Sequence, residues 1–181
     1  KLFSERMCRH FREDFGLHTR VARFHNVYGP HGTWDGGREK APAAICRKVI
    51  EAKEQGAQEI EIWGDGKQTR SFMYIDDCVD GIDMIMHCDD LVATPINLGS
   101  SELIPINTLV DYAEDIGGVK LERSHDLDAP RGVAGRNSDN TFIKEVLDWE
   151  PSTPFKDGLA KTYAWIEKQY SDRKAGKRTV S

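Results

Sequence analysis

The sequence predicts an α/β fold in which helices and strands alternate along the chain and pack in layers. Apolar residues recur at helical spacing over residues 2–15, and Gly16 follows as a stop signal. Polar and apolar residues alternate in Glu59–Trp63, as they do in a half-buried strand. Hydrophobic residues make up 39% of the 181 residues and charged residues 30%, so a globular domain with a core is expected.

Helical spacing also predicts the later helices of the chain. Pro42 stands in the first turn of one of them, where proline is tolerated, and Gly56 follows its end. Asp76 or Asp77 is placed to cap the next helix by accepting hydrogen bonds from its free backbone N–H groups. The charged residues after the last helix, 171–181, are expected to fray. The predicted helices cover residues 41–54, 76–87, 107–116, 138–147 and 155–170.

Short strands are expected between these helices. A loop rich in Gly, Pro and His, residues 25–38, follows the first strand, and α/β proteins place ligands in such loops. The turn 64–67 separates another strand from residues 70–75. Since the chain has no repeat and no low-complexity linker, residues 1–181 are expected to form a single domain. The predicted strands cover residues 19–24, 59–63, 95–98 and 120–124.

The overall composition excludes several classes of protein. A net charge of −5 argues against a nucleic-acid partner, because a surface that binds the phosphate backbone of a nucleic acid needs more basic than acidic residues. No apolar run spans a bilayer and the N-terminus does not resemble a signal peptide, so a cytoplasmic protein with no membrane partner is expected. The four cysteines lack paired metal-ligand spacing, which favours reduced thiols and no metal site.

Three stretches in the same order resemble the extended short-chain dehydrogenase/reductase superfamily, the NAD-dependent epimerases and dehydratases. They are residues 23–30 (RFHNVYGP), residues 63–77 with the motifs WGDG and RSFMYIDD, and residues 147–159 with LDWEP and a later Gly-Leu pair. The resemblance implies a Rossmann-like subunit of which this chain is the C-terminal, mainly substrate-binding region. It also implies that Arg70 lies on a hairpin that precedes a helix.

Two further strings, residues 32–44 and 135–140, look like the family of GDP-mannose 3,5-epimerases. That resemblance implies NAD-dependent epimerisation of GDP-mannose at C3 and C5 to GDP-L-galactose, with GDP-L-gulose, through a transient 4-keto sugar. It implies a GDP-sugar substrate, a homodimer when full length and, in photosynthetic eukaryotes, a role in ascorbate synthesis. Lys1 would match the lysine of a Tyr-x-x-x-Lys pair, which polarises the C4 hydroxyl and holds the nicotinamide ribose.

The glycine-rich turn that cradles a dinucleotide pyrophosphate is missing from this sequence. By the resemblance, the catalytic tyrosine and cysteine would lie upstream of Lys1. We therefore expect the N-terminal dinucleotide-binding half to be absent from this chain, and the chain alone to be inactive.

Lys40 is the candidate catalytic residue. A proton on C3 or C5 of a hexose is removable only when a neighbouring carbon is a carbonyl, which transient oxidation by NAD would supply. The resemblance assigns one proton transfer to Lys40 and the other to the upstream cysteine. A lysine can act as a base only if burial or a nearby cation such as Arg38 lowers its pKa. A solvated lysine at a helix start remains the alternative.

Two arginines are the candidate diphosphate ligands by the same resemblance, because a planar guanidinium can bind two phosphate oxygens at once. Taken alone, Arg70 could equally form an ion pair with a glutamate, and Arg136 could be an exposed loop charge. Asn26 would face the sugar phosphate and Lys48 the nucleotide. The full implied set of substrate-binding residues is Asn26, Glu39, Lys40, Ala41, Lys48, Gln68, Thr69, Arg70 and Arg136.

Two other functions remain open from the sequence. One is a different sugar-nucleotide enzyme of the superfamily, such as a UDP-glucose 4-epimerase or a 4,6-dehydratase. The other is a sugar-nucleotide-binding module without catalysis, which the absence of a glycine-rich turn favours.

Overall fold

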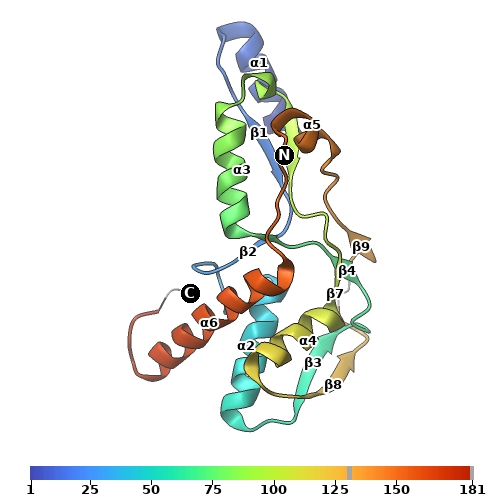
Figure 1. Ribbon diagram of the computed structural model, residues 1–181, viewed down its shortest axis with the longest axis vertical. Coiled ribbons are helices and arrows are strands. Elements are labelled where there is room, and N and C mark those ends of the chain that lie inside the picture. Colours follow the sequence, from blue (N-terminus) through green and yellow to red (C-terminus); the bar gives the residue numbers. More distant parts are fainter. Residues whose placement is uncertain (130–131, 180–181) are drawn as a thin grey trace.

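The computed structural model describes residues 1–129 and 132–179, which form an elongated molecule with two regions (Figure 1). Each region has its own cluster of buried apolar side chains. We call the region that contains the N-terminal helix the upper region, and the region built on the C-terminal helix the lower region, as they are placed in Figure 1. The chain crosses between them several times.

The upper region combines a two-stranded parallel sheet with three helices. β1 (Val21–Phe24) pairs in parallel with β6 (Pro95–Leu98), as parallel strands do when the chain between them crosses over. Helix α1 (Leu2–Phe15) is followed by Gly16, whose φ of 68° is left-handed and favours glycine. The short 3-10 helix Asp89–Leu91 precedes β6. The helices are α1 (Leu2–Phe15), α3 (Ile75–His87) and α5 (Thr141–Leu147).

The lower region packs three helices against one another and beside a second parallel pair. β3 (Glu59–Trp63) pairs in parallel with β8 (Glu122–Asp126). Every second residue of β3 is buried, as the alternation in the sequence requires. The helices are α2 (Ala41–Gln55), α4 (Ile106–Gly117) and α6 (Phe155–Lys174).

Short strands connect the two regions. β2 (Val27–Tyr28) pairs in parallel with β5 (Met73–Tyr74). β4 (Thr69–Arg70) lies between β7 (Ile104–Pro105), to which it is antiparallel, and β9 (Gly135–Arg136), to which it is parallel. Residues far apart in the sequence therefore lie close together where the upper and lower regions join.

The α/β class expected from the sequence is confirmed, and the predicted helices lie within a few residues of those observed. Within the described ranges, none of the helices has both the length and the apolar character that a membrane-spanning segment needs.

The expected hairpin at Arg70 is wrong. β3 pairs with β8 and not with the strand that follows it, and β4 pairs with β7 and β9. The predicted loop 25–38 also contains a strand, β2, because its backbone pairs with β5. The family resemblance implied the hairpin and local composition predicted the loop, and both errors concern pairing between distant segments.

Three local expectations are also corrected. Asp76 and Asp77 lie in the first turn of α3 and neither caps it; Tyr74 holds the cap position without a side-chain hydrogen bond. The strand expected at 120–124 lies at 122–126, where Glu114 accepts a hydrogen bond from the Leu121 N–H at 3.2 Å. The last helix continues to Lys174, which pairs with Glu54 on α2 at 2.9 Å.

Candidate functional site

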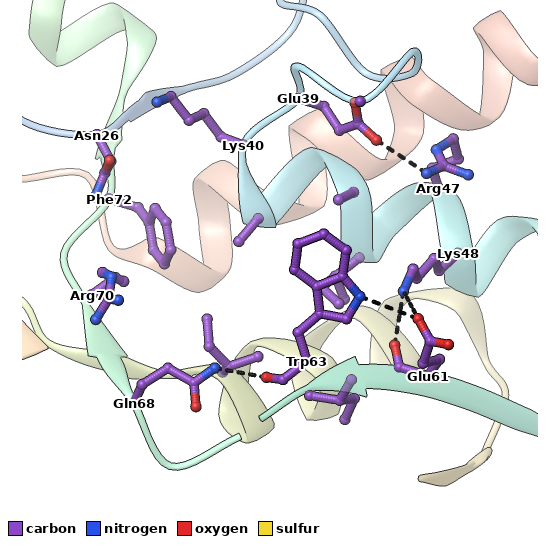
Figure 2. Close-up of a pocket in the computed structure, with 16 residues that line it drawn as sticks. Asn26, Glu39, Lys40, Arg47, Lys48, Glu61, Trp63, Gln68, Arg70 and Phe72 are labelled. Carbon is purple, nitrogen blue, oxygen red and sulfur yellow. Dashed lines mark hydrogen bonds and ion pairs between the residues drawn. The ribbon is translucent and has the colours of Figure 1, made fainter. Parts of the chain in front are cut away.

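A cavity of about 550 Å³ lies in the lower region, between the start of α2, β3 and the segment that contains β4 (Figure 2). Its volume is in the range of known small-molecule sites. Four of its residues are cationic, Lys40, Arg47, Lys48 and Arg70, and two are anionic, Glu39 and Glu61. This cavity therefore offers several cations to an anionic ligand.

Seven of the predicted substrate-binding residues line this cavity. Glu39, Lys40 and Ala41 come from the end of the loop and the first residue of α2, and Lys48 lies two turns further along the same helix. The other three come from distant segments, namely Asn26 before β2, Gln68 before β4 and Arg70 on β4. The predicted residues that do not line it are Thr69, Arg136 and Lys1.

Lys40 is exposed and holds the cap position of α2, with extended backbone angles (φ −78°, ψ 158°). Its carbonyl accepts a hydrogen bond from the Ala44 N–H at 3.0 Å, so the helix itself fixes its backbone. In Figure 2 its side chain extends from the start of α2 toward the side of the cavity where Asn26 lies. None of the ion pairs among the described residues involves Lys40. Arg38, expected to act on Lys40, does not line the cavity.

Arg70 and Arg136 are brought together by the pairing of β4 with β9. They are register partners in this parallel pair, so their side chains emerge on the same face. Arg70 lines the cavity and donates to the Thr69 carbonyl at 2.7 Å. Arg136 is exposed and does not line the cavity. Burial lowers the pKa of His25 below its usual value, and the charge of Arg136 lowers it further.

The opposite end of the cavity is formed by β3 and α2. Lys48 Nζ donates to the Glu61 carbonyl at 2.9 Å and lies 3.6 Å from the Glu61 carboxylate. The Trp63 indole N–H donates to the same carboxylate at 3.2 Å, and the Gln68 amide donates to the Trp63 carbonyl at 2.9 Å. Trp63 is 55% exposed and presents an indole ring beside these groups (Figure 2).

Several of these lining residues were not predicted from the sequence. Glu61 and Trp63 lie on β3, and the only sequence signal for Trp63 was its place as the first residue of the motif WGDG. Arg47 precedes Lys48 on α2, and nothing in the local pattern distinguishes it from any other helical arginine. Phe72 also lines the cavity, and no role in binding was predicted for it from the sequence.

Lys1 borders a different cavity, of about 570 Å³, between α1, β1 and α3. The structure therefore does not bring Lys1 and Lys40 into one site. Among the described strands, β1 pairs with β6 alone, and the sequence contains no glycine-rich turn of the kind that binds a dinucleotide. The described part of the chain also contains no group of three or more His, Cys, Asp or Glu residues that could hold a metal ion.

The sequence and the fold are similar to those of known enzymes. Residues 1–99 match the NAD dependent epimerase/dehydratase family. The chain is 46% identical over its whole length to GDP-mannose 3,5-epimerase of Arabidopsis thaliana, and 47% identical over 174 residues, 96% of the chain, to GDP-mannose 3,5-epimerase 1 of Oryza sativa subsp. indica. It covers 46% and 44% of these two proteins, and so spans less than half of their length.

The fold is similar to that of solved enzymes. UDP-glucose 4-epimerase from Thermotoga maritima, whose structure contains UDP-glucose, aligns with a TM-score of 0.81 at 26% identity. The alignment covers 94% of this chain and 52% of that enzyme. The similarity therefore extends over both regions of the chain.

Proposed function

The chain belongs to the NAD dependent epimerase/dehydratase family, and from this premise we propose that it is the substrate-binding part of an enzyme that epimerises GDP-mannose at C3 and C5. The products would be GDP-L-galactose and GDP-L-gulose. The observation that supports this most strongly is that Lys40, Arg70, Asn26, Lys48 and Gln68 all line one cavity. The 46% identity to GDP-mannose 3,5-epimerase supports the choice of substrate.

Arg70 binds the diphosphate of the substrate inside the cavity, and Arg136 binds it from the neighbouring strand β9. Their positions on paired strands allow both guanidinium groups to reach one anion. Lys48 and Gln68 face the nucleotide and Asn26 the sugar phosphate, with Glu39 and Ala41 beside them. Thr69 holds Arg70 in place through the hydrogen bond to its carbonyl.

Lys40 carries a proton to or from the sugar ring. When bound, NAD supplies the reversible oxidation at C4 that makes the hydrogens on C3 and C5 acidic. Lys40 Nζ then accepts a proton from a ring carbon or donates one to it, and the second proton-transfer group comes from outside this chain. Lys1 contributes on the cofactor side.

A dinucleotide-binding half would pack against the upper region. Among the described strands, β1 pairs only with β6, so its other edge is available for a further strand. Phe24 at the end of β1 is 54% exposed, and α3 exposes Val79, Ile82 and Met86. Without such a half, this region would be inactive. The enzyme would be a cytoplasmic homodimer that contributes to ascorbate synthesis, with the exposed α1 in its subunit contact.

The experiment that tests the activity uses the intact protein, GDP-mannose and heavy water. Deuterium is expected at both C3 and C5 of the recovered sugar, because each carbon is deprotonated and reprotonated. A 4-epimerase would leave both positions unlabelled, and a binding module would leave the sugar unchanged. Lys40→Met is expected to slow the exchange by a factor of about 10² to 10⁴, the usual contribution of a general acid or base.

Binding is tested separately by calorimetry with GDP. Arg70→Ala is expected to weaken the affinity by roughly tenfold to a hundredfold, the value of a charged hydrogen bond. Arg9→Ala is the matched control, because Arg9 is an exposed arginine on α1 that pairs with Glu13 at 2.9 Å, outside the cavity. Equal affinities of the two variants would contradict the assignment of Arg70.

A further inference from the structure

The loop that delivers Lys40 to the cavity has little structure of its own. Residues 29–40 connect β2 to α2 and contain no helix or strand. The backbone is left-handed at His31, Gly36 and Gly37, with φ of 66°, 93° and 81°. Such a segment adopts one conformation only when contacts with the rest of the molecule hold it.

One contact is a buried tryptophan covered by an arginine from the C-terminal helix. Trp34 is fully buried and belongs to the hydrophobic cluster of the lower region. The guanidinium carbon of Arg173, near the end of α6, lies 4.2 Å from the centre of its ring, in the range of a cation–π contact. Arg173 Nη1 also pairs with Asp35 Oδ2 at 2.6 Å. One side chain therefore holds two successive residues of the loop.

The second contact is an arginine on α2. Arg47 pairs with Glu39 at 3.1 Å, with Asp35 at 3.6 Å and with Glu51 of its own helix at 2.9 Å. Glu39 directly precedes Lys40, and its side chain is only 7% exposed. Asp35 is shared by Arg47 and Arg173, so the two arginines and the loop form one connected network.

We propose, on the basis of the proposed function, that Arg47 and Arg173 are positioning residues which fix loop 29–40 and thereby set the place of Lys40 at the cavity. Arg47 acts at the end of the loop next to Lys40, and Arg173 acts at its middle. Arg173 does not line the cavity, so its effect on Lys40 passes through Trp34 and Asp35. Small displacements of a catalytic group reduce rates strongly, so a loosened loop lowers the rate more than the affinity.

The chain offers a matched control at the next residue. Lys174 pairs with Glu54 at 2.9 Å, which ties the same turn of α6 to α2 without touching the loop. Arg173→Ala and Lys174→Ala each remove one ion pair from the end of α6. A merely structural role predicts similar behaviour for both variants.

The experiment measures solvent deuterium exchange at C3 and C5 with the intact protein at saturating GDP-mannose, together with GDP affinity. Arg173→Ala is expected to slow exchange by roughly tenfold to a hundredfold with an affinity change below about threefold, whereas Lys174→Ala matches the wild type. Asp35→Asn, which removes the partner on the loop, is expected to reproduce the loss. Arg173→Lys keeps the charge without the planar group over Trp34 and is expected to be intermediate.

A second measurement, which does not depend on activity, is used in case a variant folds poorly. It also distinguishes failure of this proposal from failure of the proposed function. Backbone amide hydrogen exchange of residues 33–40 is expected to accelerate in Arg173→Ala and Asp35→Asn, and to stay unchanged in Lys174→Ala. Equal substrate exchange rates for Arg173→Ala and Lys174→Ala, or unchanged amide protection of the loop, would overturn the positioning role. If the wild type shows no exchange at C3 and C5, the proposed function fails, and the amide protection still decides whether the network holds the loop.

Discussion

The upper and lower regions contain the same kinds of elements but bury them to different degrees. Helix α2 of the lower region has seven buried residues, whereas α1 of the upper region has none. Both helices show apolar residues at helical spacing and both end at a left-handed glycine. Local pattern therefore determines where a helix forms, while the burial of that helix depends on the other segments that pack against it.

The exposed side chains show which helix has few segments packed against it. On α1, Phe3 is 75% exposed and Phe15 is 74% exposed, and Leu2 is 61% exposed. In the lower region Phe155 is 1% exposed, at the centre of rings that include Tyr28, Phe72 and Tyr112. The lower region should therefore hold most of the stability of this chain.

The largest expected difference is in local unfolding. In the 181-residue chain, amides inside α2 and α6 are expected to exchange roughly a thousandfold more slowly than those of α1, because opening α1 exposes no buried side chain. Hydrogen exchange followed by mass spectrometry or NMR measures both helices in one sample. Equal protection of α1 and α2 would contradict the division into a stable and a weakly held region.

The next largest effect is expected from a core substitution in the lower region. Phe155→Ala removes the central ring of the aromatic group and is expected to lower the free energy of unfolding by about 3–5 kcal/mol. Phe15→Ala, the same change at an exposed position of α1, is the control and should cost less than about 1 kcal/mol. Urea denaturation compares the two variants, and similar losses would show that α1 packs as firmly as α6.

A smaller difference in stability between the two regions is expected for alanine substitutions at two glycines inside helices. At Gly158 of α6 a Cβ atom would lie 2.4 Å from the Tyr28 hydroxyl and 2.7 Å from the Tyr74 ring. Tyr28 is held there by donating to the Phe155 carbonyl at 3.0 Å, so Gly158→Ala is expected to cost about 1–3 kcal/mol.

Gly81 of α3 provides the counterpart in the upper region. Its nearest neighbour would be a terminal methyl of Leu98 at 2.6 Å, which can move, and the edge of Trp149 lies at 3.0 Å. Gly81→Ala is expected to cost less than about 1 kcal/mol, because alanine also favours the helix. The midpoints of urea denaturation compare the two variants. A larger loss of unfolding free energy for Gly81→Ala would mean that the upper region is the more tightly packed.

The same division between local and distant information explains what the sequence could predict. Helix ends at Gly16 and Gly56 were found because each depends on a few neighbouring residues. The hairpin at Arg70, which the family resemblance implied, was wrong because β3 pairs with β8, whose sequence lies far along the chain. Strand pairing is decided by the whole fold, which a local window does not contain.

The site shows the same limit. Lys40 and Arg70 were proposed through resemblance, and the structure places both at one cavity. Arg47 and Arg173 were not predicted, because their proposed role depends on ion pairs with Asp35 that only the folded chain brings together. Lys1 borders another cavity, which no spacing in the sequence indicated. Contacts between distant segments therefore account for most of what the sequence left out.

The smallest effect on stability is expected at the exposed rings of α1. Replacing Phe3 and Phe15 together with glutamine should change the free energy of unfolding by less than about 0.5 kcal/mol per site, because neither ring is buried. The same change should reduce concentration-dependent association of the chain, since exposed apolar rings are what such contacts bury. Light scattering over a concentration series measures association, and Arg12→Gln on the same helix is the control. A large loss of stability without any change in association would mean that these rings serve the fold of this chain and not a contact outside it.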